Sequence, residues 1–446
     1  MRQWLSRIGH EVPELDKLNI VHVAGTKGKG STCAFADSIL SHYRTKHGVP
    51  KKIGLYTSPH LVNVRERIRI NSTPITEEQF AKYFFEIWDT IEASALKEGR
   101  DTKEKPVYFR FLTLMSFHVF IREAIDVAIY EVGVGGAWDS TNIIEHPAVT
   151  GITTLGIDHV FSLGNTIEEI SWHKAGIFKT GSPAFTVEQV PGAAQVLEDR
   201  AAEKGVHLEL VKINPAMSKI KIVPNADYQR QNASLALALV QVVIENLDKR
   251  SLTDEDMDTV VKDGLEQTVW RGRCEIKMDG CRRWYLDGAH TTDSLKVAAR
   301  WFAGEAKKRP APAILIFNQQ SRPEALDILR TLQCSLQTHF GLQFHHVIFS
   351  TNVTRSTGYR TDLVNLNSDA KAVASQTLQR TFKKGWAEQD QSSTIHTVAT
   401  IQEAIEMVEE VSEDIGETNV FVTGSIHLVG GVLSLLEGVA TPIEAK

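Results

Sequence analysis

A glycine-rich stretch at residues 24–35 carries the residue types that bind a phosphate chain. It reads AGTKGKGSTCAF and follows an apolar run at 18–23, so the pattern predicts a strand, a tight turn and a helix that opens with Ser31 and Thr32. Backbone N–H groups of such a turn, and the positive end of the helix dipole, favour phosphate oxygens. Lys29 adds a cation for the terminal phosphates, and a hydroxyl can help to hold Mg²⁺. The lysine stands one place earlier than in the usual order, and a solvent-exposed turn is the alternative, but the segment predicts an ATP site.

Three further segments carry candidate ligands for a metal or an anion. Glu131 begins the run EVGVGG at the end of an apolar strand, where a carboxylate is costly unless it is paired or bound to a metal. Ser58, in TSPHL, is a candidate metal ligand, and Arg67, in VRERI, could hold a carboxylate through its planar guanidinium. A structural carboxylate, an ordinary Ser-Pro turn and a solvated run of charges remain the alternatives.

Two histidine-containing segments also follow predicted strands. His159 ends the run GIDH and precedes HKAGIFK at 173–179; alone, it would more often be a hydrogen-bonded loop histidine than a ligand. Asp287 and His290, in DGAH, could bind a ribose, a phosphate-linked water or a substrate amine. Asp287 and His290 stand in the second half of the chain, and the phosphate turn stands in the first half. This separation suggests a reaction between two domains.

The elements that must position these residues alternate between strand-like and helix-like patterns. Such alternation predicts an α/β fold with a mostly parallel sheet, and ligands bind at the carboxyl ends of its strands. The expected strands of the first part are 18–23, 52–55, 127–132 and 149–155, and its expected helices are 31–43, 77–97, 109–124 and 227–245.

The alternation starts again after residues 270–273, so the predicted domains are 1–272 and 273–446. The expected elements of the second domain are strands at 284–286, 313–317, 347–350 and 420–423, helices at 291–301 and 401–411, and a helix around 369–382.

Composition excludes several classes of protein. With 446 residues, 42% hydrophobic and 23% charged, the chain is typical of a globular protein with two or three domains. Its net charge of −6 argues against general nucleic-acid binding. The most apolar stretch, at 235–244, is too short to span a membrane. The four cysteines show no metal-binding spacing, which indicates reduced thiols and a cytoplasmic location. No secretory signal is visible, and a mitochondrial form stays open.

Taken together, the segments resemble the Mur ligase superfamily, and within it the eukaryotic type of the folylpolyglutamate synthase family. The resemblance covers nearly the whole chain. It rests on AGTKGKGST at 24–32, YTSPHL at 56–61, VRERIRI at 64–70, EVGVGGAWDSTN at 131–142, GITTLGIDH at 151–159, WHKAGIFK at 172–179, WRGR at 270–273, YLDGAH at 285–290 and VTGSIHLVGG at 422–431. It implies a Mur-ligase-like P-loop ATPase domain with a mostly parallel sheet, followed by a smaller Rossmann-like α/β domain.

The resemblance also implies roles for individual residues. Those expected to bind ATP are Gly25, Thr26, Lys27, Gly28, Lys29, Gly30, Ser31, Thr32, Asn232, Arg273 and Asp287. The expected Mg²⁺ ligands are Ser58, Glu131, His159 and Lys174, the last as a carbamate. The groups expected around the glutamate and folate are Arg67, Asp139, His290 and Ser425. Lys29, Lys174, Asp287 and His290 are the residues expected to act in catalysis.

The implied activity is an ATP-dependent ligation of L-glutamate to the γ-carboxyl of tetrahydrofolate or its polyglutamates, through an acyl phosphate. It implies ATP as co-substrate, two Mg²⁺ sites with room for a monovalent cation such as K⁺, and a monomer. Small molecules would be the only partners, without nucleic acid or a membrane span. Three positions depart from the family pattern, Ser72, Trp138 and Arg271, and these bear on substrate preference rather than on catalysis.

Two other functions remain open on the sequence. Dihydrofolate synthase shares the ATP machinery and joins the first L-glutamate to dihydropteroate. A catalytically silent nucleotide-binding protein would be expected to lack part of the lysine and metal set, which is complete here. The run TSPHLVNVRERIRI favours the polyglutamylating enzyme by resemblance.

Overall fold

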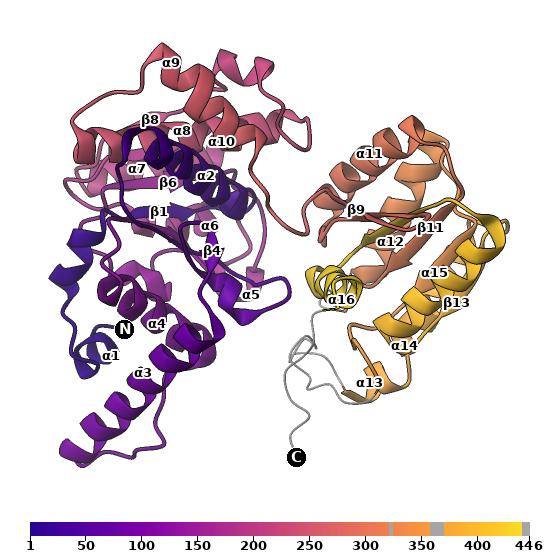
Figure 1. The fold of residues 1–446 in the computed structure, drawn as a ribbon, viewed down its shortest axis with the longest axis horizontal. Helices are drawn as coiled ribbons and strands as arrows, with labels where there is room; N and C mark the ends of the chain where they lie inside the picture. Colours follow the sequence, from indigo (N-terminus) through magenta and orange to yellow (C-terminus); the bar gives the residue numbers. More distant parts are fainter. Residues whose placement is uncertain (321–323, 357–369, 439–446) are drawn as a thin grey trace. The chain divides into compact units, whose positions relative to one another are not determined.

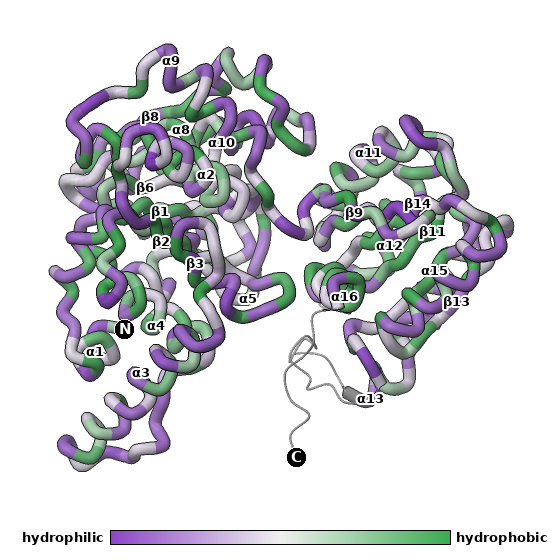
Figure 2. Tube along the Cα trace, viewed as in Figure 1, coloured by the Kyte–Doolittle hydropathy of each residue, from purple (hydrophilic) through white to green (hydrophobic). Residues whose placement is uncertain are grey.

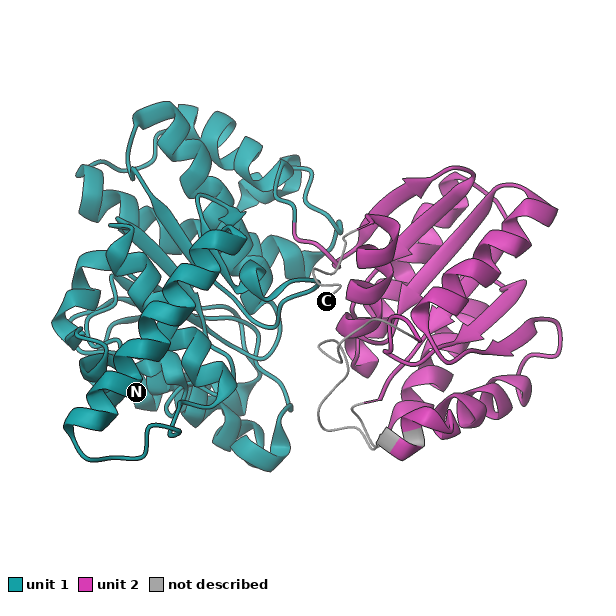
Figure 3. Ribbon diagram, turned by 60° about the horizontal axis from the view of Figure 1, so that its bottom comes forward, with its two compact units in different colours: residues 1–269 teal, residues 270–446 magenta. Residues whose placement is uncertain are grey.

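The computed structural model describes residues 1–320, 324–356 and 370–438. The chain divides into two compact units, residues 1–269 and 270–446 (Figures 1 and 3). Each unit has its own sheet and its own hydrophobic core. In the described residues, no helix combines the length and apolar character needed to cross a membrane.

The first unit is built on an eight-stranded sheet. In spatial order its strands are β4 (Thr73–Pro74), β3 (Ile68–Ile70), β2 (Ile53–Tyr56), β5 (Val127–Glu131), β1 (Val21–Ala24), β6 (Val149–Ile152), β7 (Ala184–Thr186) and β8 (Leu208–Leu210). The pairings of β3 with β2 and β4 are antiparallel, and all the others are parallel. The carboxyl ends of β2, β5, β1 and β6 therefore lie side by side at one edge, where a nucleotide site is expected.

Helices cover both faces of this sheet (Figure 1). One face carries α2 (Lys29–His47), α8 (Asp227–Asp248) and α10 (Lys262–Glu266). The other carries α1 (Arg2–Arg7), the 3₁₀ turn η1 (Val12–Leu18), α3 (Glu77–Lys97), α4 (Tyr108–Arg122), α6 (Ile167–Lys174) and α7 (Pro191–Glu203). The shorter elements are η2 (Val64–Arg67), η3 (Ser140–Ile143), α5 (Val160–Leu163), η4 (Ala175–Ile177), η5 (Pro215–Lys219), α9 (Asp254–Asp256) and η6 (Met257–Val261).

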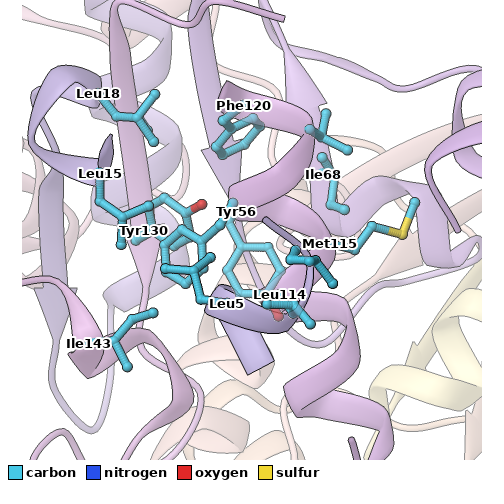
Figure 4. Close-up of a cluster of buried hydrophobic side chains, with 14 of the residues drawn as sticks. Leu5, Leu15, Leu18, Tyr56, Ile68, Leu114, Met115, Phe120, Tyr130 and Ile143 are labelled. Carbon is cyan, nitrogen blue, oxygen red and sulfur yellow. The ribbon is translucent and has the colours of Figure 1, made fainter. Parts of the chain in front are cut away.

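A large hydrophobic cluster joins α1, η1, α3 and α4 to strands β2 and β5 (Figure 4). Tyr56 and Tyr130 are fully buried there beside Leu114, Met115 and Phe120. The Tyr56 hydroxyl is 2.9 Å from Thr113 Oγ1, so its polar end is satisfied. Burying each such side chain contributes about 1.5–3 kcal/mol. This packing holds the carboxyl ends of β2 and β5 in place.

The second unit has a six-stranded sheet. In spatial order its strands are β13 (Thr394–Thr397), β12 (His346–Phe349), β11 (Ala313–Phe317), β14 (Thr418–Thr423), β10 (Arg282–Leu286) and β9 (Glu275–Asp279), and only the pairing of β9 with β10 is antiparallel. The helical segments are α11 (Thr292–Lys308), α12 (Ala325–Cys334), η7 (Ser335–His339), α13 (Ala370–Ala374), α14 (Thr377–Ala387), α15 (Ile401–Ile415) and α16 (Ile426–Leu436). Figure 2 shows hydrophobic residues along β11, β14 and α16.

The α/β fold class predicted from the sequence is confirmed by these two mostly parallel sheets. The predicted helix 77–97 coincides with α3, because Thr76 and Gln79 form a capping box at its start. The single helix predicted around 369–382 is wrong within the described residues. Two helices, α13 and α14, occupy the described part, and Gln376 between them has a φ of 53°, which a right-handed helix cannot contain.

Asp37 is a buried carboxyl on α2, and it makes the stability of the first unit sensitive to pH. Its side chain is 5% exposed, and Oδ1 has no hydrogen-bond partner in the structure. Burial raises the pKa of Asp37 to about 6, against smaller opposite effects of Ser72, Arg69 and Arg44. The folded state therefore keeps its Asp37 proton up to about pH 6, whereas the unfolded state loses that proton near pH 4. The free energy of unfolding accordingly falls as the pH rises from about 4 to about 6.

We expect Asp37→Asn to raise the free energy of unfolding at pH 7.5 by about 1–3 kcal/mol, because the amide carries no charge to desolvate. The gain should shrink as the pH falls to 4, where the wild-type carboxyl is itself neutral. Urea unfolding of both proteins across this range measures the difference. Asp89, exposed on α3, gives the matched control Asp89→Asn. A gain that is equal at pH 4 and pH 7.5 would contradict the account.

Candidate active site

The glycine-rich turn joins β1 to α2, as the sequence predicts. Gly28 is the N-cap residue of α2 with a φ of 90°, and Lys29 is the first residue of the helix. The first turn of α2 contains no acidic residue, so the N–H groups at its start face no competing carboxylate from that turn. The N–H groups of Thr26 and Lys27 donate to the carbonyl of Thr154, at 3.0 Å each. The loop that follows β6 therefore fixes the shape of the phosphate turn.

Two glycines are required because neighbouring side chains approach the backbone. Gly25 has a φ of 146°, and a Cβ there would lie 1.8 Å from Thr153 Oγ1. A Cβ on Gly28 would lie 2.3 Å from Oδ1 of Asn232. The structure therefore places Asn232 of α8, predicted to contact the nucleotide, against the phosphate turn. Its amide also donates to Gln229 Oε1, which orients the side chain.

A threonine in the first turn of α2, just after the phosphate turn, has an unsatisfied hydroxyl. Thr32 is fully buried, and its Oγ1 has no hydrogen-bond partner in the structure. A buried polar atom without a partner is costly unless a ligand or a metal completes it. The hydroxyl at this place in a phosphate turn is one that can bind Mg²⁺, so Thr32 fits the metal expected from the sequence.

The carboxylate of Glu131 stands at the end of β5, beside the phosphate turn. It is 5% exposed, and the backbone N–H of Ser58 donates to its Oε2 at 3.0 Å. Ser58 follows β2 and Glu131 ends β5, and these strands are neighbours in the sheet. The structure thus brings together two of the predicted metal ligands. Oxygen atoms of this kind are the ligands that Mg²⁺ prefers.

Lys174 ends α6 and points at the phosphate turn. Its Nζ donates to the carbonyl oxygen of Gly25 at 2.8 Å, and the side chain is 3% exposed. Burial, followed by the charge of Lys29, lowers the pKa of Lys174 to about 7. A neutral amine can add to CO₂, whereas an ammonium cannot. The environment of Lys174 therefore suits the carbamate that the resemblance implies.

His159 and Asp139 lie on loops beside these groups. His159 precedes α5 with a φ of 52°, and its Nε2 is 3.9 Å from Asp158 Oδ2. Asp139 accepts hydrogen bonds from the N–H groups of Thr141 and Val134, and it caps η3. The carboxylate therefore shapes the loop 133–139. A metal role for His159 and a substrate role for Asp139 stay predictions.

Within the part of the chain that is described, no three His, Cys, Asp or Glu side chains gather into a metal site. The metal assignment depends instead on mixed ligands: the carboxylate of Glu131, the hydroxyls of Ser58 and Thr32, and a modified Lys174. The sequence names Thr32 as an ATP-binding residue but leaves open whether Ser31 or Thr32 supplies the hydroxyl for the metal; the buried, unpartnered Oγ1 favours Thr32.

Arg67 is a buried cation at the end of η2. It is 8% exposed, its Nε donates to His60 Nδ1 at 3.0 Å, and its guanidinium carbon lies 5.5 Å from the ring centre of Tyr108. A guanidinium held by an imidazole and an aromatic ring presents its remaining donors in a fixed direction. This geometry suits the binding of a carboxylate, and the substrate role of Arg67 stays a prediction.

In the second unit, Asp287 follows β10 and is buried. Its Oδ2 accepts the N–H of Cys274 at 2.8 Å, and Oδ1 accepts the N–H of Ala289 at 2.9 Å. Burial raises the pKa of Asp287, although the nearby Arg273 acts in the opposite direction. Asp287 and Arg273, both predicted to bind the nucleotide, therefore lie in one cluster of the second unit.

His290 and Ser425 lie on two loops at the same end of this sheet. His290 Nδ1 is 3.0 Å from the carbonyl oxygen of Gly288. A carbonyl only accepts, so Nδ1 carries the proton of that bond, and a neutral ring then has Nε2 as its acceptor nitrogen. Ser425 caps α16, where its Oγ accepts the N–H of His427 at 3.2 Å.

Gln319 connects these two loops, and sequence reasoning missed it. It is 1% exposed, and its Nε2 donates to the carbonyl oxygens of His290 at 3.0 Å and Gly424 at 2.9 Å. Gln319 therefore positions the backbone next to both predicted substrate-binding residues. The two polar residues Asn318 and Gln319, which follow the apolar strand β11, were the signal that could have found it.

Comparison with known proteins shows which families and relatives this chain is similar to. The family described as dihydrofolate synthetase, C-terminal domain, matches residues 275–435. Folylpolyglutamate synthase of Neurospora crassa is 52% identical over 98% of this chain and 85% of its own length. Folylpolyglutamate synthase of a Saccharomyces cerevisiae strain is 45% identical over 98% of this chain and 80% of its own.

A solved structure of Mycobacterium tuberculosis folylpolyglutamate synthase complexed with ADP has the same fold. Its TM-score is 0.74 at 24% identity, over 98% of this chain and 95% of that one.

Proposed function

This chain belongs to the folylpolyglutamate synthase family, and we propose that it joins L-glutamate to the γ-carboxyl of tetrahydrofolate or its polyglutamates with the consumption of ATP. The observation that carries the proposal is the cluster at the carboxyl ends of β1, β2 and β5. It combines a phosphate turn, a buried carboxylate and a buried lysine, which are the groups that a ligase needs to activate a carboxylate. The names of the relatives supply the two substrates.

The reaction needs activation because a carboxylate is a poor acyl donor. An oxygen of the folate γ-carboxylate attacks the γ-phosphorus of ATP, ADP leaves, and an acyl phosphate forms. The amine of L-glutamate then attacks the acyl carbon, phosphate leaves, and the nitrogen loses a proton to complete the amide. Lys29 and the N–H groups at the start of α2 hold the phosphates in line and offset the charge on the transferred group.

The metal expected in this site is Mg²⁺. Glu131, Ser58 and Thr32 would hold it, with His159 and the carbamate of Lys174 at a second position. Bound there, Mg²⁺ neutralises phosphate charge and orients the oxygens for displacement. The buried, unpartnered hydroxyl of Thr32 and the buried carboxylate of Glu131 support this assignment.

We assign substrate binding to Arg67 in the first unit and, separately, to His290 and Ser425 in the second unit. Arg67 offers a cation for a carboxylate, and Nε2 of a neutral His290 can accept a proton or a hydrogen bond from the amine. We place the reaction in a reducing compartment, the cytosol or a mitochondrion, because Cys33 and Cys274 are free thiols in buried positions.

The test is release of ADP by the purified protein with ATP, Mg²⁺ and L-glutamate, with either tetrahydrofolate or dihydropteroate as acceptor. We expect turnover with tetrahydrofolate and a product heavier by one glutamyl residue. Turnover with dihydropteroate alone would replace the proposal by dihydrofolate synthase, which the match to the dihydrofolate synthetase family makes the relevant alternative. ATP binding without turnover on either acceptor would indicate a silent nucleotide-binding protein.

A further inference from the structure

A basic pocket lies in the first unit, between α1, the loop that follows α3 and the first turn of α4. Its volume is about 520 Å³. The ionisable side chains that line it are Arg7, Arg100, Lys105 and Arg110 against Glu98 and Glu104. Cations therefore exceed anions by two in this pocket, in a chain whose net charge is −6. None of these residues belongs to the site described above.

Three of the cations are held in place by the protein itself. Arg100 Nε lies 2.8 Å from Glu98 Oε2. Arg7 donates to the carbonyl of Ile91 at 3.2 Å and lies over the ring of Trp4 at 4.5 Å. Lys105 is 3.0 Å from Glu92 Oε1 and 4.4 Å from the ring centre of Trp88. Arg110, by contrast, is exposed in the first turn of α4, so its guanidinium can meet a ligand from solvent.

The first turn of α4 connects this pocket to the active site of the same unit. Three consecutive residues make the connection. The ring of Phe109 packs against the backbone of Gly133, just after Glu131, so closely that a side chain at Gly133 would not fit. Tyr108 stacks with Arg67, and Arg110 lines the pocket. The first turn of α4 therefore contacts both residues of the active site and the basic pocket.

We propose that this pocket binds the α-carboxylates of the γ-glutamyl tail of a polyglutamylated folate. The inference rests on the proposed function, because that reaction makes a tail with one free α-carboxylate for every glutamate added. A flexible polyanion of this kind is recognised by several separate cations, each as a charge-assisted hydrogen bond. The pocket would thus make the enzyme favour substrates that already carry a tail.

The test compares tetrahydropteroyl monoglutamate with the pentaglutamate as acceptor, in the wild-type protein and in the variant Arg110→Gln. We expect KM for the pentaglutamate to rise about fivefold, which corresponds to the upper value of about 1 kcal/mol for an exposed ion pair. KM for the monoglutamate and for ATP, and kcat, should change less than about twofold, because Arg110 touches neither the phosphate turn nor Arg67.

Two further variants make the result specific. Lys103 lies in the same loop but outside the pocket, so Lys103→Gln removes an equal charge and should leave KM for the pentaglutamate unchanged. Glu104→Gln removes an anion from the pocket and should lower KM for the pentaglutamate. Added salt should weaken the preference for the pentaglutamate in the wild type more than in Arg110→Gln.

Three outcomes would overturn the inference. An unchanged KM for the pentaglutamate in Arg110→Gln would mean that the tail does not enter the pocket. An equal rise in KM for the monoglutamate and the pentaglutamate would assign the pocket to the pteroyl part that the two acceptors share. An equal rise in Arg110→Gln and Lys103→Gln would reduce the effect to general surface charge. A wild-type protein that uses no folate at all would instead refute the proposed function, so the two failures are distinguishable.

Discussion

Replacing Lys29 by methionine is expected to lower kcat by about 10³-fold, because it removes the mobile cation from the start of α2. Groups that stabilise charge only as it develops in a transition state are worth about 3–4 kcal/mol in a shielded site. Lys29 is the first residue of the helix and is only partly buried, so its loss should leave the fold intact. The measurement is kcat for ADP release, together with the thermal midpoint of the variant.

The matched control is Lys51→Met, which removes a positive charge from an exposed position between α2 and β2. It should keep wild-type kcat. A kcat for Lys29→Met within about tenfold of the wild type would contradict the assignment of the phosphate turn, because removing one transition-state donor costs at least about 10²-fold.

Lys174→Ala is expected to lower kcat by about 10²-fold or more, and short carboxylic acids such as acetate should restore part of the loss. The reason lies in the pKa of about 7 that burial and Lys29 impose on the amine. At pH 7.5 most of a lysine with that pKa is neutral, against about one part in 10³ for an ordinary lysine. The neutral nitrogen adds to CO₂ and loses a proton, which converts a cation into a carbamate anion.

The carbamate itself can be observed. Protein equilibrated with ¹³C-labelled bicarbonate should show a carbamate carbon signal by NMR, and Lys174→Ala should lack that signal. Lys204 provides the control, because burial also lowers its pKa, to about 8, while it donates to the carbonyls of Gly176 and Phe178. Lys204→Met should keep the signal. A signal that persists in Lys174→Ala, or is absent from the wild type, would contradict the modification.

The sequence was sufficient for the order of the elements and for the edge of the sheet that carries the chemistry. The phosphate turn, TSPHL, Glu131 and GIDH each follow an apolar run, and the structure places these runs in adjacent strands β1, β2, β5 and β6. The spacing of hydrophobic residues and the positions of glycines at turns are local features of the sequence, so they can be recognised without knowledge of tertiary contacts. The short strands β7 and β8 lack such a signal and were not predicted.

The break between α13 and α14 shows the limit of the same local signals. The residues around 369–382 favour a helix by type, but Gln376 adopts a left-handed conformation. The following helix α14 packs its Phe382 and Trp386 into the core of the second unit. Contacts made by residues distant in sequence therefore decide where this helix starts, and a window of neighbouring residues does not contain them.

What the sequence by itself determined was the set of chemical groups and the strand ends on which they stand. Only the tertiary structure decided their environments. Burial beside the carbonyl of Gly25 gives Lys174 its low pKa, an unsatisfied hydroxyl marks Thr32, and the amide of Gln319 ties together the loops of His290 and Ser425. The physical reason is that desolvation and hydrogen bonding depend on which segments pack together in space, whereas residue type and spacing describe only the local chain.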